Sequence, residues 1–374
     1  MKISSNFDSG NIELVSQDDK GDFQLKIRKD TSSDFLQWFH FRLTGAKEQH
    51  CKISIINAGE TSYPKGWENY NACASYDKIE WFRIPTTFVD GKLTMDFTPM
   101  HNSVHIAYFA PYSYEQHQEM VHQAQLADNC ELSSIGQTVQ GKEMDMLTIG
   151  DMNPSKKKIW LIARQHPGES MAEWFIEGAI GRLLDPTDPH SRKILEDANI
   201  YVIPNMNIDG SIAGNLRSNF AGANLNREWE NPRLKESPEV YHTLKKMDEI
   251  GVDLLLDVHG DEELPYNFVA GSEGIPNYTE RMKALEDKFK AHWILTCPDF
   301  QDEYNYGPDE PGKANMTVCS NQVSSRFDCL AYTIEMPFKD NNDLPDELYG
   351  WSNERSIKLG ESVLLPILQV LGDI

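Results

Sequence analysis

The sequence predicts an α/β protein in two parts, an N-terminal antiparallel β-sandwich followed by an α/β domain with a largely parallel central sheet. Three observations support this prediction. Short segments of β-type composition recur up to about residue 115, separated by turn residues such as Asp90-Gly91. Beyond Pro111, predicted strands alternate with predicted helices, which is typical of a parallel sheet covered by helices. Four of those strands run directly into polar residues, and open α/β sheets bind ligands at that edge.

The N-terminal elements are short and closely spaced. Several strands at such a spacing, with turn residues between them, favour a sandwich. The predicted strands are Phe23–Arg28, Gln37–Leu43, Cys51–Ile56, Lys78–Ile84, Lys92–Phe97 and Ser103–Phe109.

The C-terminal elements alternate in type. Compact apolar runs predict strands at Lys158–Ala163, Ile200–Pro204, Asp253–Val258 and Leu330–Glu335. Helices are predicted over Tyr114–Ala127, Ser170–Leu184, Pro238–Ile250, Tyr278–Ala291 and Glu354–Leu371. The acidic stretch Pro298–Pro311, which contains prolines, is predicted to be a long surface loop.

Composition and charge limit the classes of function. The formal net charge is −23, with 58 acidic and 35 basic residues, and such a surface repels phosphate backbones, which argues against nucleic-acid binding. No secretory leader is recognised at Met1–Gly10, and no apolar run is long enough for a membrane span. The six cysteines form no C-x-x-C pair, so we expect free thiols in a cytoplasmic protein without a membrane partner.

Three side chains that follow predicted strands have the chemistry of a catalytic metal site. His166 and Glu169 form H-x-x-E at a strand-to-helix turn, and His259 follows another strand. Two histidines and one glutamate are a known catalytic zinc set, because they leave a coordination position for water. The H-x-x-E pair alone is common at helix starts, so the prediction depends on all three residues together with the carboxylate of Glu335.

Glu335 and a group of arginines complete the candidate site. Glu335 lies between apolar residues at the end of a strand, where a buried carboxylate is costly unless it is paired or functional. Asp257 precedes His259 by two residues and is a candidate to orient that histidine. Arg217 and Arg227 lie in glycine-containing loops, and guanidinium groups bind carboxylates through paired hydrogen bonds. Surface arginines are usually solvated, so this last feature is weak alone.

Taken together, the motifs resemble the zinc carboxypeptidase family, and more closely its cytosolic branch. The family order of H-x-x-E, N-x-D-G, an arginine, a D-L-N-R-like run, a strand-ending His and a strand-ending Glu is present. The H-P-G-E form and the ending Thr333-Ile334-Glu335-Met336 are similar to the cytosolic branch, as are Gln37–Arg42 and Tyr108–Tyr112. The resemblance covers nearly the whole chain. It implies a β-sandwich over residues 1–115 and an α/β/α carboxypeptidase domain with a mixed, mostly parallel sheet over residues 116–374.

The resemblance implies a role for each matching residue. His166, Glu169 and His259 match the ligands of one Zn²⁺ ion per chain, and Glu335 matches the glutamate that activates water. Arg217 matches the arginine that polarises the scissile carbonyl, and Asn226 with Arg227 matches the pair that binds the substrate's terminal carboxylate. The expected substrates are therefore the C-termini of peptides or proteins.

Three points stay open at this stage. Asn224 stands where the family usually has Asp, and either Tyr304 or Tyr306 could cover the substrate. The specificity position falls near Ser320, with Lys313 and Arg326 as the nearby basic residues. In the cytosolic branch a basic residue there accompanies removal of acidic C-terminal residues, so an acidic preference is one expectation.

Two rival functions share part of this pattern. A zinc-dependent N-acyl amino acid deacylase or amidase on the same fold would use the same metal ligands and Glu335, but it would not need the N-terminal β-domain. A catalytically silent peptide-binding protein would lack a metal ligand or the base, and all of these residues are present.

Overall fold

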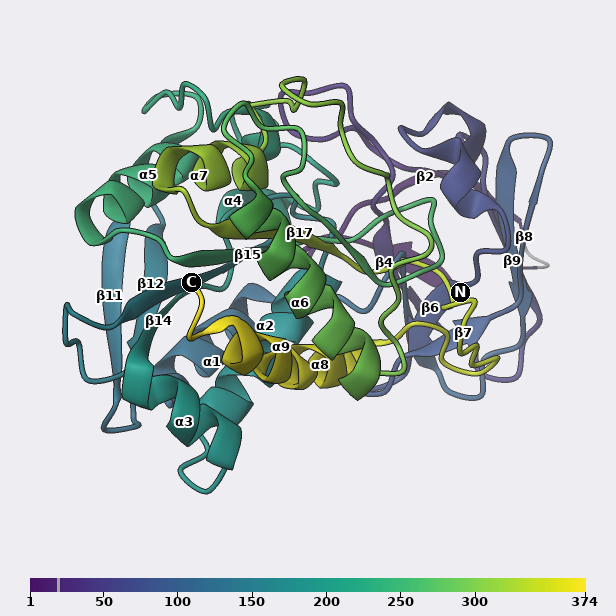
Figure 1. Cartoon of the computed structure of the whole chain (residues 1–374). Coiled ribbons are helices and arrows are strands. Elements are labelled where there is room, and N and C mark those ends of the chain that lie inside the picture. Colours follow the sequence, from purple (N-terminus) through teal and green to yellow (C-terminus); the bar gives the residue numbers. More distant parts are fainter. Residues whose placement is uncertain (19–20) are drawn as a thin grey trace.

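Residues 1–18 and 21–374 are described by the computed structural model, which contains three β-sheets (Figure 1). Two five-stranded sheets form the N-terminal part, and a seven-stranded sheet with helices on both faces forms the rest. The predicted fold class is confirmed.

The two N-terminal sheets pack their apolar faces into a shared core. One sheet has the order β1-β4-β10-β6-β7 and is antiparallel, and the other has the order β2-β3-β5-β9-β8 with β3 and β5 parallel. Alternate residues of β3, β4, β5 and β9 are buried, as expected for strands with one face in a core. The strands are β1 Lys2–Ser4, β2 Glu13–Gln17, β3 Asp22–Lys26, β4 His40–Thr44, β5 Cys51–Ile55, β6 Ala72–Ser75, β7 Phe82–Ile84, β8 Thr86–Val89, β9 Lys92–Phe97 and β10 Ser103–Ala107, with 3₁₀ turns η1 Ala58–Glu60 and η2 Pro64–Trp67.

The Asp90-Gly91 pair forms the tight turn between β8 and β9. Both residues have positive φ, 51° and 73°, which is the conformation that a two-residue hairpin turn requires. The sequence prediction of a turn here is confirmed.

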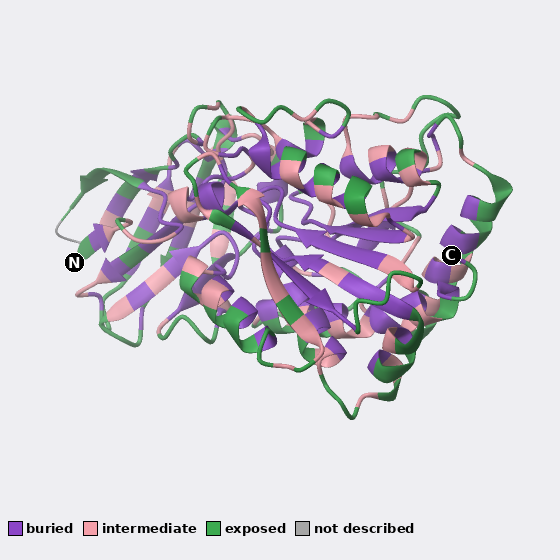
Figure 2. Cartoon of the chain, turned by 90° about the vertical axis from the view of Figure 1, so that its left-hand side faces the viewer, coloured by how far each residue is buried: buried purple, intermediate pink, exposed green. Residues whose placement is uncertain are grey.

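The central sheet is parallel in its middle and antiparallel at its edges. Its order is β11-β12-β14-β13-β15-β17-β16, in which β14, β13, β15 and β17 run parallel. The middle strands are almost completely buried (Figure 2), which is typical of a sheet covered on both faces. The strands are β11 Cys130–Gln137, β12 Glu143–Ile149, β13 Lys157–Ala163, β14 Ala198–Ile203, β15 Leu254–Val258, β16 Phe268–Ala270 and β17 Leu330–Glu335.

Alternating side chains of the central sheet enter two separate cores. Ile159 and Leu161 of β13 pack with helices α2, α8 and α9, whereas Trp160 and Ile162 pack with α5 and α7 on the other face. The helices are α1 Tyr114–Ala124, α2 Met171–Leu183, α3 Pro189–Asp197, α4 Ile208–Ala213, η3 Leu225–Arg227, α5 Pro238–Ile250, α6 Glu280–Thr296, α7 Cys319–Phe327, α8 Asn353–Ser362 and α9 Leu364–Val370.

The C-terminal helix predicted over Glu354–Leu371 is two helices, α8 and α9. Pro366 has no N–H group to donate to the carbonyl of Ser362, so one continuous helix would lose a hydrogen bond at this point. The break lets α9 pack against α6 and α3 while α8 packs against α2.

All six cysteines are free thiols, as the sequence predicted. Within residues 1–18 and 21–374, no helix is both long enough and apolar enough to cross a membrane.

Candidate active site

The candidate site begins where parallel strands of the central sheet end. Ala163 of β13 pairs with Val258 of β15, and Val258 pairs with Ile334 of β17, so the residues that follow these strands lie at one edge. The backbone N–H of His259 donates to the carbonyl of Ile334 at 2.8 Å, so the C-terminal ends of β15 and β17 are aligned with each other. The predicted edge of polar residues is therefore formed.

Arg164 holds the turn that leaves β13. Its backbone is left-handed, with φ 54°, and its buried guanidinium donates to the carbonyl of Pro167 through Nε and Nη2. The same guanidinium pairs with Glu173 of α2 at 2.7 Å. These contacts shape the loop that presents His166 and Glu169.

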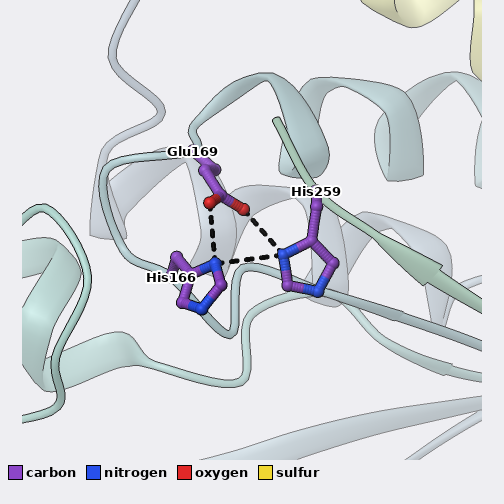
Figure 3. Close-up of side chains that lie close together, drawn as sticks. All are labelled: His166, Glu169 and His259. Carbon is purple, nitrogen blue, oxygen red and sulfur yellow. Dashed lines mark hydrogen bonds and ion pairs between the residues drawn. The ribbon is translucent and has the colours of Figure 1, made fainter. Parts of the chain in front are cut away.

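His166, Glu169 and His259 converge on one point (Figure 3). The carboxylate of Glu169 lies 2.7 Å from Nδ1 of His166 and 2.8 Å from Nδ1 of His259, and the two Nδ1 atoms are 3.1 Å apart. Each residue is at most 3% exposed. Among the described residues, these are the only three that could jointly hold a metal ion.

The outer nitrogens of both imidazoles face acceptors. Nε2 of His166 lies 3.0 Å from Oδ1 of Asn224, and Nε2 of His259 lies 3.0 Å from Oδ2 of Asp257. An Nε2–H donated outward leaves the lone pair of Nδ1 directed at the shared point, which is how ligand histidines are usually oriented. The predicted contact of Asp257 with His259 is present, and Asn224, where the resemblance would place Asp, contacts His166 through its amide oxygen.

Charge at this point suits a cation. Burial lowers the pKa of His166 to about 4, so this ring is neutral and able to bind a metal. Burial also lowers the pKa of His259, but Asp257 and Glu169 outweigh it and raise that pKa well above its ordinary value. Despite its burial, Glu169 has a lowered pKa because both histidines stabilise the carboxylate. Two imidazoles and a carboxylate are a donor set that fits Zn²⁺.

Glu335 ends β17 beside this cluster. Burial, together with the negative charges of Glu169 and Asp261, raises its pKa well above the usual value. Its Oε2 is buried without a partner among the described residues, and its Oε1 lies 3.2 Å from the hydroxyl of Tyr306. A cation at the neighbouring cluster would favour the ionised form of Glu335.

A cavity of about 310 Å³ opens over these residues and contains both predicted arginines. Arg217 lies between the rings of Phe35 and Tyr63, with its guanidinium carbon 5.8 Å and 5.6 Å from their centroids. Arg227 and Asn226 belong to η3 and also line the cavity, and Oδ1 of Asn226 accepts from the N–H of Cys319 at 2.8 Å. All seven predicted site residues therefore lie in or directly beside one cavity.

The structure also distinguishes the open candidates. Tyr306 lines the cavity, whereas Tyr304 stacks on Tyr266. Ser320 lines the cavity and hydrogen-bonds to Thr333 at 3.0 Å. Lys313 does not line it, and Arg326 does not either, because its guanidinium pairs with Asp248 on the outer surface.

The sequence analysis did not identify a second group of residues at this site. Glu262, Glu273 and Asp309 line the cavity, and Asp30 of the N-terminal part binds the Arg217 segment. Glu262 follows the His259-Gly260-Asp261 turn and could have been included on that basis. The others lie on loops without periodicity, and their positions depend on contacts between distant parts of the chain.

Comparisons with known proteins agree with this geometry. A family model for zinc carboxypeptidases matches residues 117–352, and one for the N-terminal domain of cytosolic carboxypeptidases matches residues 3–109. A metallo-carboxypeptidase from Burkholderia cenocepacia is 46% identical, with a TM-score of 0.97 over 100% of this chain and 99% of that one. A metallo-carboxypeptidase from Pseudomonas aeruginosa is 43% identical, with a TM-score of 0.97 over 100% of both chains. Cytosolic carboxypeptidase 6 from Caenorhabditis elegans is 27% identical over 90% of this chain and 78% of its own length.

The match to the catalytic family model extends over most of the chain, and the fold agrees with metallo-carboxypeptidases along its whole length. The chain belongs to the zinc carboxypeptidase family and is a peptide hydrolase.

Proposed function

We propose that this metallocarboxypeptidase removes the C-terminal residue of peptides or proteins with one Zn²⁺ held by His166, Glu169 and His259. The observation that carries the proposal is the convergence of these three side chains within 3.1 Å of one another, beside Glu335 and a cavity containing two arginines. When bound, the zinc ion supplies a Lewis acid that polarises a carbonyl and lowers the pKa of a coordinated water towards about 7.

The chain's own side chains would carry the remaining steps. Glu335 accepts the proton of the attacking water through its unpartnered Oε2 and then delivers it to the leaving amine. Arg217 stabilises the negative charge that develops on the scissile carbonyl oxygen, because its guanidinium lies in the same cavity. Arg227 and Asn226 bind the terminal carboxylate, which restricts cleavage to the end of the chain.

The residues proposed for catalysis do not determine which C-terminal residue the enzyme prefers. An acidic preference needs a basic group in the side-chain pocket, and the described lining residues contain none besides Arg217 and Arg227. The Pseudomonas aeruginosa relative was solved in complex with (2-guanidinoethylmercapto)succinic acid, a compound whose name includes both a guanidino group and carboxylic acids. A ligand of that chemistry favours a cavity that accepts a carboxylate and a cation together.

Two further assignments belong to the proposal. The boundary between residues 1–115 and 116–374 places the change of domain after β10, close to where the two family models divide the chain. A cytoplasmic location is supported by the six free thiols and by the relatives named cytosolic carboxypeptidases.

The sharpest test is the response to a blocked C-terminus. Amidating a peptide's C-terminus and replacing Arg227 by Ala remove the same contact, and a charge-assisted contact is worth roughly 1.5–3 kcal/mol, or about 10- to 150-fold in kcat/KM. The two changes together should cost little more than the larger one, because they share one interaction. If Arg227→Ala cleaves free-acid peptides at the wild-type rate, a deacylase acting on N-acyl amino acids becomes the better assignment.

A further inference from the structure

The active-site cavity contains more carboxyl groups than the reaction uses. Besides Glu169 and Glu335, three carboxylates line it, those of Glu262, Glu273 and Asp309. The only basic side chains among the described lining residues that are permanently charged are Arg217 and Arg227. Arg217 lies close enough to Glu262 to offset part of its charge, whereas neither arginine is paired with Glu273 or Asp309 in the part of the chain that the structure describes.

Glu273 has no partner in the part of the chain that the structure describes. Its carboxylate makes no hydrogen bond and no ion pair there, although the residue is half-buried and lines the cavity. Glu262 is 6% exposed, lines the same cavity, and its Oε1 is buried without a partner. Unpartnered carboxylates facing a cavity are costly to desolvate, so a bound cation would stabilise them.

A second carboxylate lies directly behind Glu273. A side-chain carbon placed on Gly271 would lie 2.7 Å from Oε2 of Glu273 and 2.8 Å from Oε1 of Glu286. The glycine therefore leaves room for two acidic groups against one stretch of backbone. Glu286 accepts hydrogen bonds from Tyr278 and from the N–H of Ser272, and burial followed by the charge of Glu273 raises its pKa to about 7.

The Glu273 segment also lies against the specificity position. Ser272, next to Glu273, donates through Oγ to the carbonyl of Ala331 at 3.1 Å and lies 3.5 Å from the carbonyl of Ser320. Ser320 has a small side chain and lines the same cavity as Glu273, so a terminal side chain in this cavity would lie near both residues. Arg227 binds the α-carboxylate in the same cavity under the proposed function.

We propose that Glu273 is a specificity-determining residue that gives this carboxypeptidase a preference for a C-terminal lysine or arginine. The inference rests on the proposed function, because it assumes that the terminal residue occupies this cavity. An ammonium or guanidinium group would form a charge-assisted hydrogen bond with Glu273 and would be attracted by Asp309. A terminal glutamate would be repelled by the same groups.

The test uses zinc-loaded enzyme and peptides that differ only in their last residue, Arg, Leu or Glu. We expect wild-type kcat/KM to be highest for Arg and lowest for Glu. Glu273→Gln keeps the shape, and it should lower kcat/KM for the Arg peptide by about 10- to 100-fold while leaving the Leu peptide nearly unchanged. Glu273→Lys should raise cleavage of the Glu peptide relative to the Arg peptide. The control is Glu280→Gln, an exposed glutamate outside the cavity, which should leave the order unchanged.

Faster cleavage of the Glu peptide by the wild type, or an equal loss on all three peptides in Glu273→Gln, would overturn the inference. Those results still show exopeptidase activity, so they leave the proposed function intact. If none of the three peptides is cleaved, the proposed function fails and this inference fails with it.

Discussion

Asp30 connects the N-terminal part to the segment that contains Arg217, and its replacement by Asn tests whether that connection matters for catalysis. Its carboxylate accepts hydrogen bonds from the backbone N–H groups of Leu216, Arg217 and Ser218 at 2.6, 2.8 and 2.9 Å. The hydroxyl of Ser218 donates to it at 3.0 Å. Four donors from three successive residues thus meet one side chain of the other domain, and the middle residue is Arg217.

The expected cost follows from the donor count. An Asn side chain has one acceptor oxygen, and if it takes the place of Oδ2 it keeps three donors but turns an NH₂ group towards the N–H of Leu216. Losing one charge-assisted bond costs about 1.5–3 kcal/mol. Burial raises the pKa of Asp30 despite its four donors, so removing the charge recovers some desolvation free energy. We therefore expect a loss of about 1–3 kcal/mol in the free energy of unfolding.

Catalysis should fall because the Arg217 segment moves. We expect kcat/KM to drop by about 10-fold, less than the 10²–10³-fold typical of removing an oxyanion-stabilising donor outright. The matched control is Asp34→Asn on the same loop, because Asp34 is 95% exposed and, among the described residues, pairs only with Lys29. Zinc content should be unchanged in both variants.

A double-mutant cycle separates positioning from general destabilisation. If Asp30 acts through Arg217, then Asp30→Asn should change kcat/KM by less than about twofold in an Arg217→Ala background. A full 10-fold loss in that background would show that Asp30 acts on another part of the molecule. Wild-type activity in the single variant Asp30→Asn would refute the positioning role directly.

Three further predictions concern the general base, the metal site and the stability. Glu335→Gln should lower kcat by at least about 10²-fold while zinc stays bound. His259→Ala should lose most of the zinc that is measured after purification. Full zinc occupancy in His259→Ala would show that this residue is not a zinc ligand. Burial lowers the pKa of His117, but Asp145 and Glu173 outweigh it and raise that pKa to about 9. A rise from 6.5 to about 9 corresponds to about 3 kcal/mol of stability that is fully present below pH 6.5 and lost as pH rises through 9. The free energy of unfolding, measured with urea, should be lower at pH 9 than at pH 6 in the wild type. An equal decrease in His117→Gln would contradict the assignment of this pH dependence to His117.

The strands that carry the site were predictable because their sequence and their burial agree. β13 and β17 are short apolar runs that are buried on both faces, so composition alone identifies them, and the polar residues that follow mark the binding edge. The same reasoning missed β11 and β12, which lie at the edge of the sheet and mix exposed with buried residues. It also missed α3, although Asp188 followed by Pro189 is a recognisable helix start.

The residues that the sequence did not reveal have a common physical cause. Asp30 binds backbone amides 186 to 188 residues away. Every residue except proline has a backbone N–H group, so the sequence does not show which loop aspartate makes these contacts. Glu273 faces the cavity only because β16, a strand of three residues, pairs antiparallel with β17 at the edge of the sheet. Neither position leaves a periodic pattern in the sequence.

This difference explains why the reaction could be predicted and the substrate could not. The proposed metal ligands and general base must be held rigidly, and they follow buried strands whose apolar sequence is easy to recognise. The terminal side chain of a peptide is recognised by the summed charge of loop residues, and one exchange among them can reverse the preference without disturbing the sheet. The residues on which the family resemblance rests follow the ends of these strands, so the resemblance supports the same chemistry for this chain. The preference for the terminal residue depends on the charged groups that line the cavity of this chain, and the proposed role of Glu273 makes that preference one for a cation.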